Sequence, residues 1–214
     1  LGQSATAHRR RTRNVVKTAL AKHAHRLVHT SSVAAYGLHD GPIIETTRSN
    51  ASASGINYFV SKALAEAEVR KGIDAGLDAV IINPGNVMGP GDTDAWARLV
   101  RLVHAGKVPA VGGGGGSFCH VREVARAHIA ASEKGRSGEN YLLGGADATY
   151  LELMQVTQRI PGGKAPRRAM PPAVMKAAGY LLPLVAKLTG GPADLTPAMA
   201  RIMSSGVYID CAKA

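Results

Sequence analysis

The spacing of apolar residues along the first two-thirds of the chain alternates between a helical period and short continuous runs. Apolar residues at helical spacing predict four helices, at 14–25, 58–75, 93–104 and 121–134. Short apolar runs predict buried strands at 26–30, 78–82 and 141–143, and a long loop rich in Gly, Pro, Ser and Asn covers 37–55. Strands separated by helices of this length imply right-handed crossovers and a parallel sheet, so we expect an α/β fold.

The pattern changes after residue 148, where only helices are predicted. Thr149 and Glu152 form a capping-box pattern that opens a helix, and a basic, Pro-rich connector follows at 161–172. Further helices are expected over 172–188, with an interruption at Pro183, and from Thr196-Pro197 onward. We therefore expect two parts. Residues 1–147 form the sheet part, with cap elements interleaved around 93–116, and residues 148–214 form a small, mostly helical cap.

Positive charge is concentrated at the N-terminus. The 214 residues carry a net charge of +11, and residues 1–26 hold seven basic residues and no acidic one. Such an arm can bind nucleic-acid phosphates. No nucleic-acid motif accompanies it, so we favour a ragged terminus or a solvated helix face and expect no nucleic-acid partner.

Cysteine usage and hydropathy bear on the compartment. Cys119 and Cys211 form no CxxC pair, which fits a reducing cytoplasm. The most apolar stretch, 177–186, is half as long as the roughly 20 residues that a membrane-spanning helix needs. We expect a cytoplasmic protein that acts on a small molecule, without a membrane partner, and a homodimer is compatible with this picture.

Tyr58 and Lys62 are the first candidates for chemistry. They lie four residues apart on one predicted helix and therefore share a face. A phenol titrates near pKa ~10, and a neighbouring ammonium lowers that pKa. Such a pair can give a proton to a substrate oxygen, or take one, while hydride moves from or to a nicotinamide. The spacing alone is weak evidence, because a surface tyrosine beside a surface lysine produces the same pattern.

Two strand ends supply the context. Ser32 follows the first predicted strand, at the carboxyl edge where open α/β sheets bind ligands, and its hydroxyl could hydrogen-bond a reacting oxygen. Capping of the next turn is the alternative role. The second strand ends in Pro84-Gly85, within a Gly-rich segment that runs to Asp92. Its glycines permit close approach to a flat cofactor ring, although an ordinary turn would use them too.

Five segments in a fixed order resemble one family. They are HTSS at 29–32 with Tyr36-Gly37, YFVSK at 58–62, NPGNVMGPGD at 83–92, FCHV at 118–121 with VARA at 124–127, and YID at 208–210 with Lys213-Ala214. Together they resemble the extended short-chain dehydrogenase/reductase family, also called the NAD-dependent epimerase/dehydratase family. Within it, the chain looks most like dihydroflavonol-reductase-like and sugar-epimerase-like members. The resemblance implies a partial Rossmann-like parallel sheet with flanking helices and a helical substrate cap.

The resemblance also implies roles for individual residues. Ser32 orients and polarises the substrate oxygen, Tyr58 is the general acid/base, and Lys62 tunes Tyr58 and binds the nicotinamide ribose. Pro84, Gly85 and Val87 shape the nicotinamide pocket. The cofactor is NAD or NADP, a choice that the sequence leaves open. No metal is expected, because the predicted change from helix to strand would point the clustered histidines His23, His25 and His29 apart.

The departures from the family pattern suggest a truncated chain. The family opens with a strand and a Gly-rich turn that holds the pyrophosphate, and no such turn is found here. The run Gly112–Gly116 lies far downstream, and we interpret it as a flexible turn. We expect about 90 residues to be missing at the N-terminus, or about three βαβ units, and a few at the C-terminus. Residues 1–11 match poorly, and the basic arm could be a translation artefact.

The leading functional hypothesis is Tyr/Lys/Ser-assisted hydride transfer to or from a secondary alcohol or ketone on a sugar, flavonoid-like or steroid-like skeleton. The alternative is a catalytically inactive remnant, or a binding module of the same fold. Reductase, dehydratase and epimerase activities are not distinguished by these residues. Because the glycine-rich turn is absent, we expect this chain to bind dinucleotide poorly.

Overall fold

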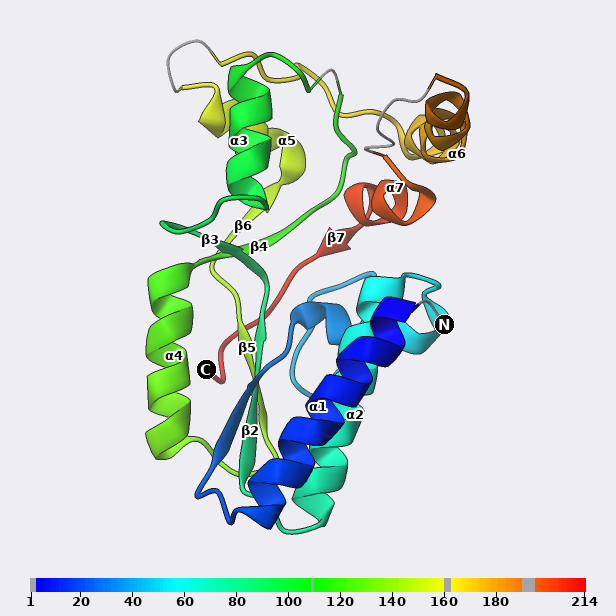
Figure 1. The fold of residues 1–214 in the computed structure, drawn as a ribbon. Coiled ribbons are helices and arrows are strands. Elements are labelled where there is room, and N and C mark those ends of the chain that lie inside the picture. Colours follow the sequence, from blue (N-terminus) through cyan, green and yellow to red (C-terminus); the bar gives the residue numbers. More distant parts are fainter. Residues whose placement is uncertain (1–2, 109, 160–162, 190–194) are drawn as a thin grey trace. The chain divides into compact units, whose positions relative to one another are not determined.

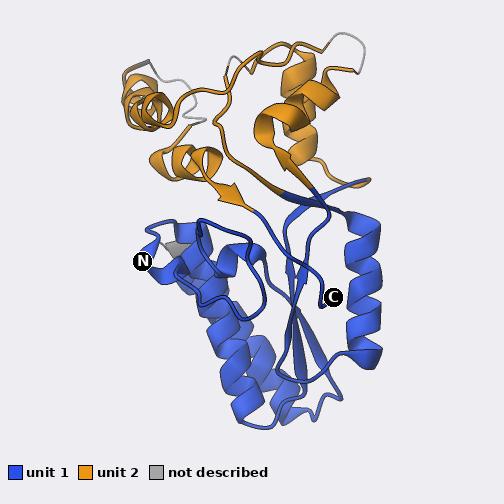
Figure 2. Cartoon of the chain, turned by 180° about the vertical axis from the view of Figure 1, so that it is seen from behind, with its two compact units in different colours: residues 1–89, 117–146, 208–214 blue, residues 90–116, 147–207 orange. Residues whose placement is uncertain are grey.

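The computed structural model describes residues 3–108, 110–159, 163–189 and 195–214 (Figure 1). The chain divides into two compact units, coloured in Figure 2: unit 1 contains residues 1–89, 117–146 and 208–214, and unit 2 contains residues 90–116 and 147–207. Residues 208–214, which we expect in the helical cap, belong to unit 1 in the structure. None of the helices in the described ranges combines the length and apolarity that crossing a bilayer requires.

Unit 1 is built on a three-stranded parallel sheet, which confirms the predicted fold class. Its strands are β1 (Leu27–Thr30), β2 (Ala79–Pro84) and β5 (Asn140–Leu143), in the order β1-β2-β5. Helices α1 (Gln3–Ala21) and α2 (Asn57–Asp74) cover one face, and α4 (Val121–Lys134) covers the other (Figure 1). The central strand β2 is buried along its whole length, as expected for a parallel strand covered on both faces.

The two faces of β2 divide its apolar side chains by the two-residue period of a strand. Ala79 and Ile81 pack with Val16 of α1 and Val69 of α2, whereas Val80 and Ile82 pack with Ala131 of α4, so the sheet holds two layers of core. Helices on both sides therefore explain the burial of β2, whose carboxyl end is at Pro84.

Helix α1 corrects the expectation for the N-terminus. It begins at Gln3 instead of residue 14, and it ends at Ala21 instead of residue 25. Arg9 and Arg13 donate to the buried carboxylate of Glu68 on α2, with N–O distances of 2.8 and 3.0 Å, and Lys71 adds a third contact at 3.1 Å. Hydrogen bonds from Arg13 and Arg9 lower the pKa of Glu68 to about 2. Part of the basic arm is therefore an ordered component of the fold.

The segment after β2 and the run Gly112–Gly116 contain strand residues where only loop and turn are predicted. Strand β3 (Asn86–Met88) lies inside the predicted loop at 83–92 and pairs in parallel with β4 (Gly115–His120). The run Gly112–Gly116 is not a flexible turn, because its last two residues belong to β4. A side chain at Gly114 would place Cβ only 2.1 Å from the carbonyl oxygen of Ser205, so close backbone packing requires glycine here.

Unit 2 contains α3 (Trp96–His104), β6 (Ala146–Thr149, whose first residue belongs to unit 1), α5 (Tyr150–Thr157), α6 (Pro172–Thr189), α7 (Pro197–Ser204) and β7 (Gly206–Val207). The predicted capping box opens α5, with Thr149 and Glu152 exchanging both hydrogen bonds. Trp96 stacks on Tyr150 with 6.1 Å between ring centroids, which joins α3 to α5. The interruption predicted at Pro183 is wrong, because α6 continues through this residue.

Candidate functional site

Ser32 lies directly beyond β1, at the carboxyl edge of the sheet. Its Oγ accepts the backbone N–H of Ala34 at 3.2 Å and so caps the short 3-10 helix η1 (Val33–Ala35). This is the capping role that was the alternative to a catalytic one. The two roles are compatible, because a hydroxyl that accepts one hydrogen bond still has its own proton to donate.

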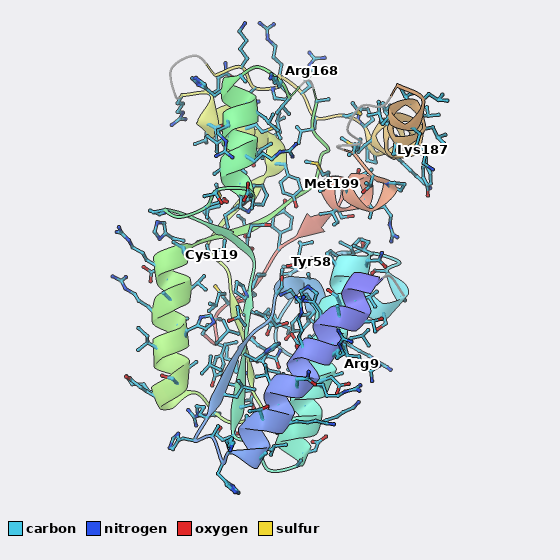
Figure 3. The ribbon with its side chains drawn as sticks, viewed as in Figure 1. Arg9, Tyr58, Cys119, Arg168, Lys187 and Met199 are labelled. Carbon is cyan, nitrogen blue, oxygen red and sulfur yellow. The ribbon has the colours of Figure 1, made fainter. Side chains whose placement is uncertain are left out.

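Tyr58 and Lys62 lie in the first two turns of α2, as predicted. The side chain of Tyr58 is half exposed, at 51%, and Figure 3 shows it near the N-terminal end of the helix. Lys62 Nζ lies 5.8 Å from the centroid of the Tyr58 ring, and Lys62 is half-buried. Within the described residues, Lys62 Nζ donates to no hydrogen-bond acceptor, which leaves its N–H groups free to bind a ligand. The ammonium and the phenol are thus neighbours on one face of α2.

Asn83 joins Ser32 to this face of α2. The Nδ2 group of Asn83 donates to the carbonyl oxygen of Ser32 at 3.1 Å and to Oε1 of Glu66 at 2.5 Å. Glu66 lies four residues after Lys62 and eight after Tyr58, so all three side chains occupy the same face of the helix. Because Glu66 reaches the fully buried Asn83, this face is turned toward the ends of β1 and β2. The structure thereby brings the two predicted catalytic segments together.

The hydrogen bonds around Asn83 extend to Asn140 of β5. Asn140 donates to Oδ1 of Asn83 at 2.8 Å and to Glu66 at 3.3 Å, and it accepts a hydrogen bond from Arg70. The buried ring of Tyr36 lies beside this cluster, where burial and the carboxylates of Glu66 and Glu45 raise its pKa. Sequence reasoning missed this polar network. Two signals could have found it: Glu66 repeats the four-residue spacing of Tyr58 and Lys62, and Asn83 interrupts an otherwise apolar strand.

His29 of β1 adds an electrostatic link to the site. Burial, and next the charge of Lys62, lower its pKa to about 4. Its Nε2 atom is buried and has no hydrogen-bond partner in the part of the chain that the structure describes. The imidazole therefore stays neutral near neutral pH, and the sheet next to Lys62 carries no second positive charge from His29.

Pro84, Gly85 and Val87 lie at and just beyond the end of β2. Gly85 donates its N–H to Leu143 at 2.9 Å, and a Cβ at this position would lie 2.6 Å from the carbonyl oxygen of Ser117. Contact with β4 is thus sufficient to require glycine here, without a cofactor ring. Val87 pairs with Cys119 in the β3–β4 ladder. The nicotinamide contacts of these three residues remain a prediction.

A cavity of about 500 Å³ opens beside β5, but none of the predicted site residues lines it. Its walls combine two acidic and two basic side chains, Glu45, Glu139, Arg70 and Lys213, with backbone and apolar groups. Lys213 is held there by Glu139 at 2.6 Å and by the carbonyl oxygen of Asn140 at 2.8 Å. The cavity reaches the polar network through Arg70 and Asn140, whereas Ser32 contacts that network through Asn83.

The donor groups at this edge suit one half of a dinucleotide. A half-buried ammonium without an acceptor, a half-exposed phenol and a serine hydroxyl match the hydroxyl groups of a ribose and the oxygen of a reacting carbonyl. The given sequence contains no Gly-rich turn at a helix N-terminus for the pyrophosphate. Among the described residues, no group of three or more His, Cys, Asp or Glu side chains is placed to hold a metal ion.

Comparisons with known proteins agree with this geometry. The model of the NAD dependent epimerase/dehydratase family matches residues 3–144, a range that includes the basic arm. Sterol demethylase protein B of Methylococcus capsulatus is 31% identical over 79% of this chain and 53% of its own length. A Synechocystis protein named "Putative dihydroflavonol 4-reductase" is 31% identical over 75% of the chain and 49% of its own length. The chain thus spans about half the length of these curated relatives.

Solved structures share the fold. A nucleoside-diphosphate-sugar epimerase from Pseudomonas aeruginosa matches all of this chain and 66% of its own, with a TM-score of 0.80 and 24% identity. At that identity the likeness concerns the fold alone. It agrees with the Rossmann-like sheet and flanking helices seen in unit 1, and the match of the family model to residues 3–144 contradicts an artefactual origin for most of the basic arm.

Proposed function

The chain belongs to the NAD-dependent epimerase/dehydratase family, and we propose that it carries the catalytic face of a nicotinamide-dependent oxidoreductase or epimerase acting on a secondary alcohol or ketone. One observation supports this most directly. The hydrogen bonds from Asn83 to Ser32 and to Glu66 join the serine segment to the helix face that bears Tyr58 and Lys62. The three residues named for catalysis thus lie on two segments that the buried amide of Asn83 joins.

Each side chain has a distinct task in this proposal. When bound, the nicotinamide supplies or accepts a hydride at the substrate carbon. In the reducing direction, the Tyr58 hydroxyl gives its proton to the carbonyl oxygen as that oxygen becomes an alcohol, and in the oxidising direction it takes the proton back. Ser32 donates a hydrogen bond to the same oxygen while negative charge develops on it. Lys62 donates hydrogen bonds to the hydroxyl groups of the nicotinamide ribose.

The substrate class rests on the relatives. The printed names of two relatives refer to a sterol and to a dihydroflavonol, both fused-ring alcohols or ketones, and a fold neighbour is a sugar epimerase. We propose a steroid-like or flavonoid-like skeleton first and a sugar second. NAD and NADP are both retained in this proposal.

The alternative is a catalytically inactive module of the same fold. The sequence offers no Gly-rich turn for the pyrophosphate, although backbone N–H groups at such a turn supply much of the dinucleotide's binding energy. Titration with NADH and NADPH separates the two readings. Weak or absent binding favours the inactive module, whereas micromolar binding by a monomer supports the catalytic alternative.

The test of the proposed chemistry is Tyr58→Phe. We expect it to lower steady-state turnover with a panel of steroid, flavonoid and sugar ketones by at least about 100-fold, the usual loss when a general acid is removed. The melting temperature should stay the same, because the phenol is half exposed. Oxidation of NADH and NADPH, followed by absorbance, gives the rate.

Tyr180→Phe is the matched control, because Tyr180 is exposed to a similar extent, 57%, but lies on α6 in unit 2. It should leave turnover unchanged. Equal rates for Tyr58→Phe and the unmodified chain would remove Tyr58 from the mechanism.

A further inference from the structure

Helix α6 exposes a row of large apolar side chains. Val174, Leu181, Leu184, Val185 and Leu188 recur at intervals that place them on one side of the helix, and we call them the outer stripe. Each is at least half exposed, and Leu188 reaches 88%. A row of this size is unusual on the surface of a soluble domain and marks a contact with something apolar.

The opposite side of α6 is already occupied. Met175 and Gly179 are buried there, and α6 packs on α7, where a Cβ at Gly179 would lie 2.6 Å from Cβ of Ala200. The helix is therefore held by one face within unit 2. The outer stripe points away from that contact, because its members lie about half a turn from Met175 and Gly179 on the helix.

The sequence from the middle of α5 through α6 carries charge of a single sign. Residues 153–193 contain six basic residues and no acidic one: Arg159, Lys164, Arg167, Arg168, Lys176 and Lys187. Lys176 and Lys187 are three turns apart, lie on the same flank of the stripe with the exposed Tyr180 between them, and form no ion pair with any described residue. Figure 3 shows the Lys187 side chain leaving α6.

We propose that α6 lies along the surface of a bilayer that contains anionic phospholipid. The outer stripe enters the boundary between headgroups and acyl chains, and Lys176, Lys187 and the connector arginines Arg167 and Arg168 face the phosphates. Tyr180 suits the same boundary, because an aromatic ring with a polar tip is favoured there. This inference does not depend on the proposed function.

Charge complementarity selects the bilayer over a second copy of the chain. Two copies joined through their outer stripes would bring Lys176 and Lys187 of each together, with no acidic residue in 153–193 to neutralise them. Anionic headgroups supply that neutralisation. The expectation that this chain has no membrane partner rests on the length needed to cross a bilayer. A helix lying in the interface needs only one apolar side and basic flanks.

Co-flotation of the whole chain with vesicles tests the proposal. We expect partition into vesicles of phosphatidylcholine with phosphatidylglycerol to exceed partition into pure phosphatidylcholine by about tenfold or more, and to weaken as salt is added. Leu181→Gln, Leu184→Gln and Leu188→Gln combined should lower partition into both vesicle types by about tenfold or more, while keeping helix propensity. Lys176→Gln with Lys187→Gln should reduce only the preference for anionic vesicles.

The matched control is Ile129→Gln, since Ile129 is an exposed aliphatic residue, at 61%, on α4 of unit 1. It should float like the unmodified chain. Absence of flotation by the intact chain, or unchanged flotation by the triple variant, overturns the proposal. A lipid-free dimer would also overturn the proposal, if light scattering detects it in the intact chain, if the triple variant abolishes it, and if the intact chain does not bind vesicles. Should the triple variant unfold, we would instead measure the tryptophan fluorescence of Leu184→Trp with vesicles that contain brominated acyl chains. If this fluorescence is quenched no more than that of Trp96 in the unmodified chain, the proposal is overturned.

Discussion

Helices α2 and α6 have the same length, 18 residues, but break the usual distribution of polar and apolar side chains in opposite ways. Helix α2 turns Lys62 and Glu66 toward the sheet, and Glu66 meets buried amides there. Helix α6 turns leucines outward and keeps only a narrow side against α7. Buried polar groups and exposed large apolar rows are the informative departures from the ordinary pattern.

The difference lies in what each helix finds around it. Helix α2 is enclosed by the sheet on one side and by α1 on the other, and its inward carboxylate, Glu66, has amide partners on β2 and β5. Helix α6 packs mainly on α7 within unit 2, and the side chains of its outer stripe are at least half exposed. We therefore expect changes in the α2 framework to cost stability, and changes in the outer stripe of α6 to cost association instead.

The largest effect is expected from Asn83→Leu. The substitution keeps the branching and the number of side-chain heavy atoms but removes the donor to Ser32 and Glu66 and the acceptor for Asn140, in a position with no exposed surface. Removing one hydrogen-bond partner each from the Ser32 carbonyl, the Glu66 carboxylate and the Asn140 amide should lower the free energy of unfolding by about 2–4 kcal/mol. Chemical denaturation followed by circular dichroism measures the loss.

Asn86→Leu is the control for this prediction. Asn86 lies only three residues later, is half-buried and makes a single 3.3 Å contact with the carbonyl oxygen of Ser117. Its replacement should cost less than about 1 kcal/mol. Equal losses for the two variants would mean that the network around Asn83 contributes nothing beyond an ordinary amide contact.

A second prediction concerns the loss of folding stability at low pH, to which His29 contributes. Its pKa is about 4 in the folded chain and near 6.5 when unfolded, so between these values the unfolded chain binds the additional proton. Stability from this group is complete above pH ~6.5 and falls as the pH drops toward 4, by up to about 2–3 kcal/mol. His29→Leu should remove this part of the pH dependence, while His120→Gln at an exposed position should retain it.

Lys62 provides the link between this titration and the candidate site. Removing the ammonium with Lys62→Met should raise the pKa of His29 toward its ordinary value, although burial remains the larger cause of the shift. Titration of the imidazole by nuclear magnetic resonance measures this directly. An unchanged pKa would show that the two side chains are not close enough to interact, which would contradict the arrangement of α2 over β1.

Much of the fold follows from local signals. The helix at 121–134 and the capping box at Thr149 match the structure because their apolar spacing and capping residues act within a few positions. The start of α1 was missed because its stability comes from Glu68, 55 to 59 residues away in sequence from the two arginines. The role of Gly112–Gly116 was missed for the same reason, since the backbone that packs against Gly114 belongs to Ser205.

The candidate site, like the fold, has a part that local sequence signals predict and a part that they do not. Ser32, Tyr58 and Lys62 could be named from spacing and strand ends, which are local properties of the sequence. The amide and carboxylate framework that joins them could not, because Asn83, Glu66 and Asn140 lie on three different elements and meet only in the folded sheet. The order of β1, β2 and β5 decides that meeting, and no single segment encodes it.

The smallest effect is expected on the α6 side of the comparison. Leu184→Gln replaces a side chain that is already 57% exposed with a good helix former, so the free energy of unfolding should change by less than about 0.5 kcal/mol. Met175→Gln on the same helix buries an amide against α7 and should cost about 2 kcal/mol or more, because Met175 is only 3% exposed. Hydrogen exchange of the α6 amides measures both changes within unit 2 alone. A large loss for Leu184→Gln without lipid would mean that the outer stripe is covered by protein in solution, and α6 would then resemble α2 instead of contrasting with it.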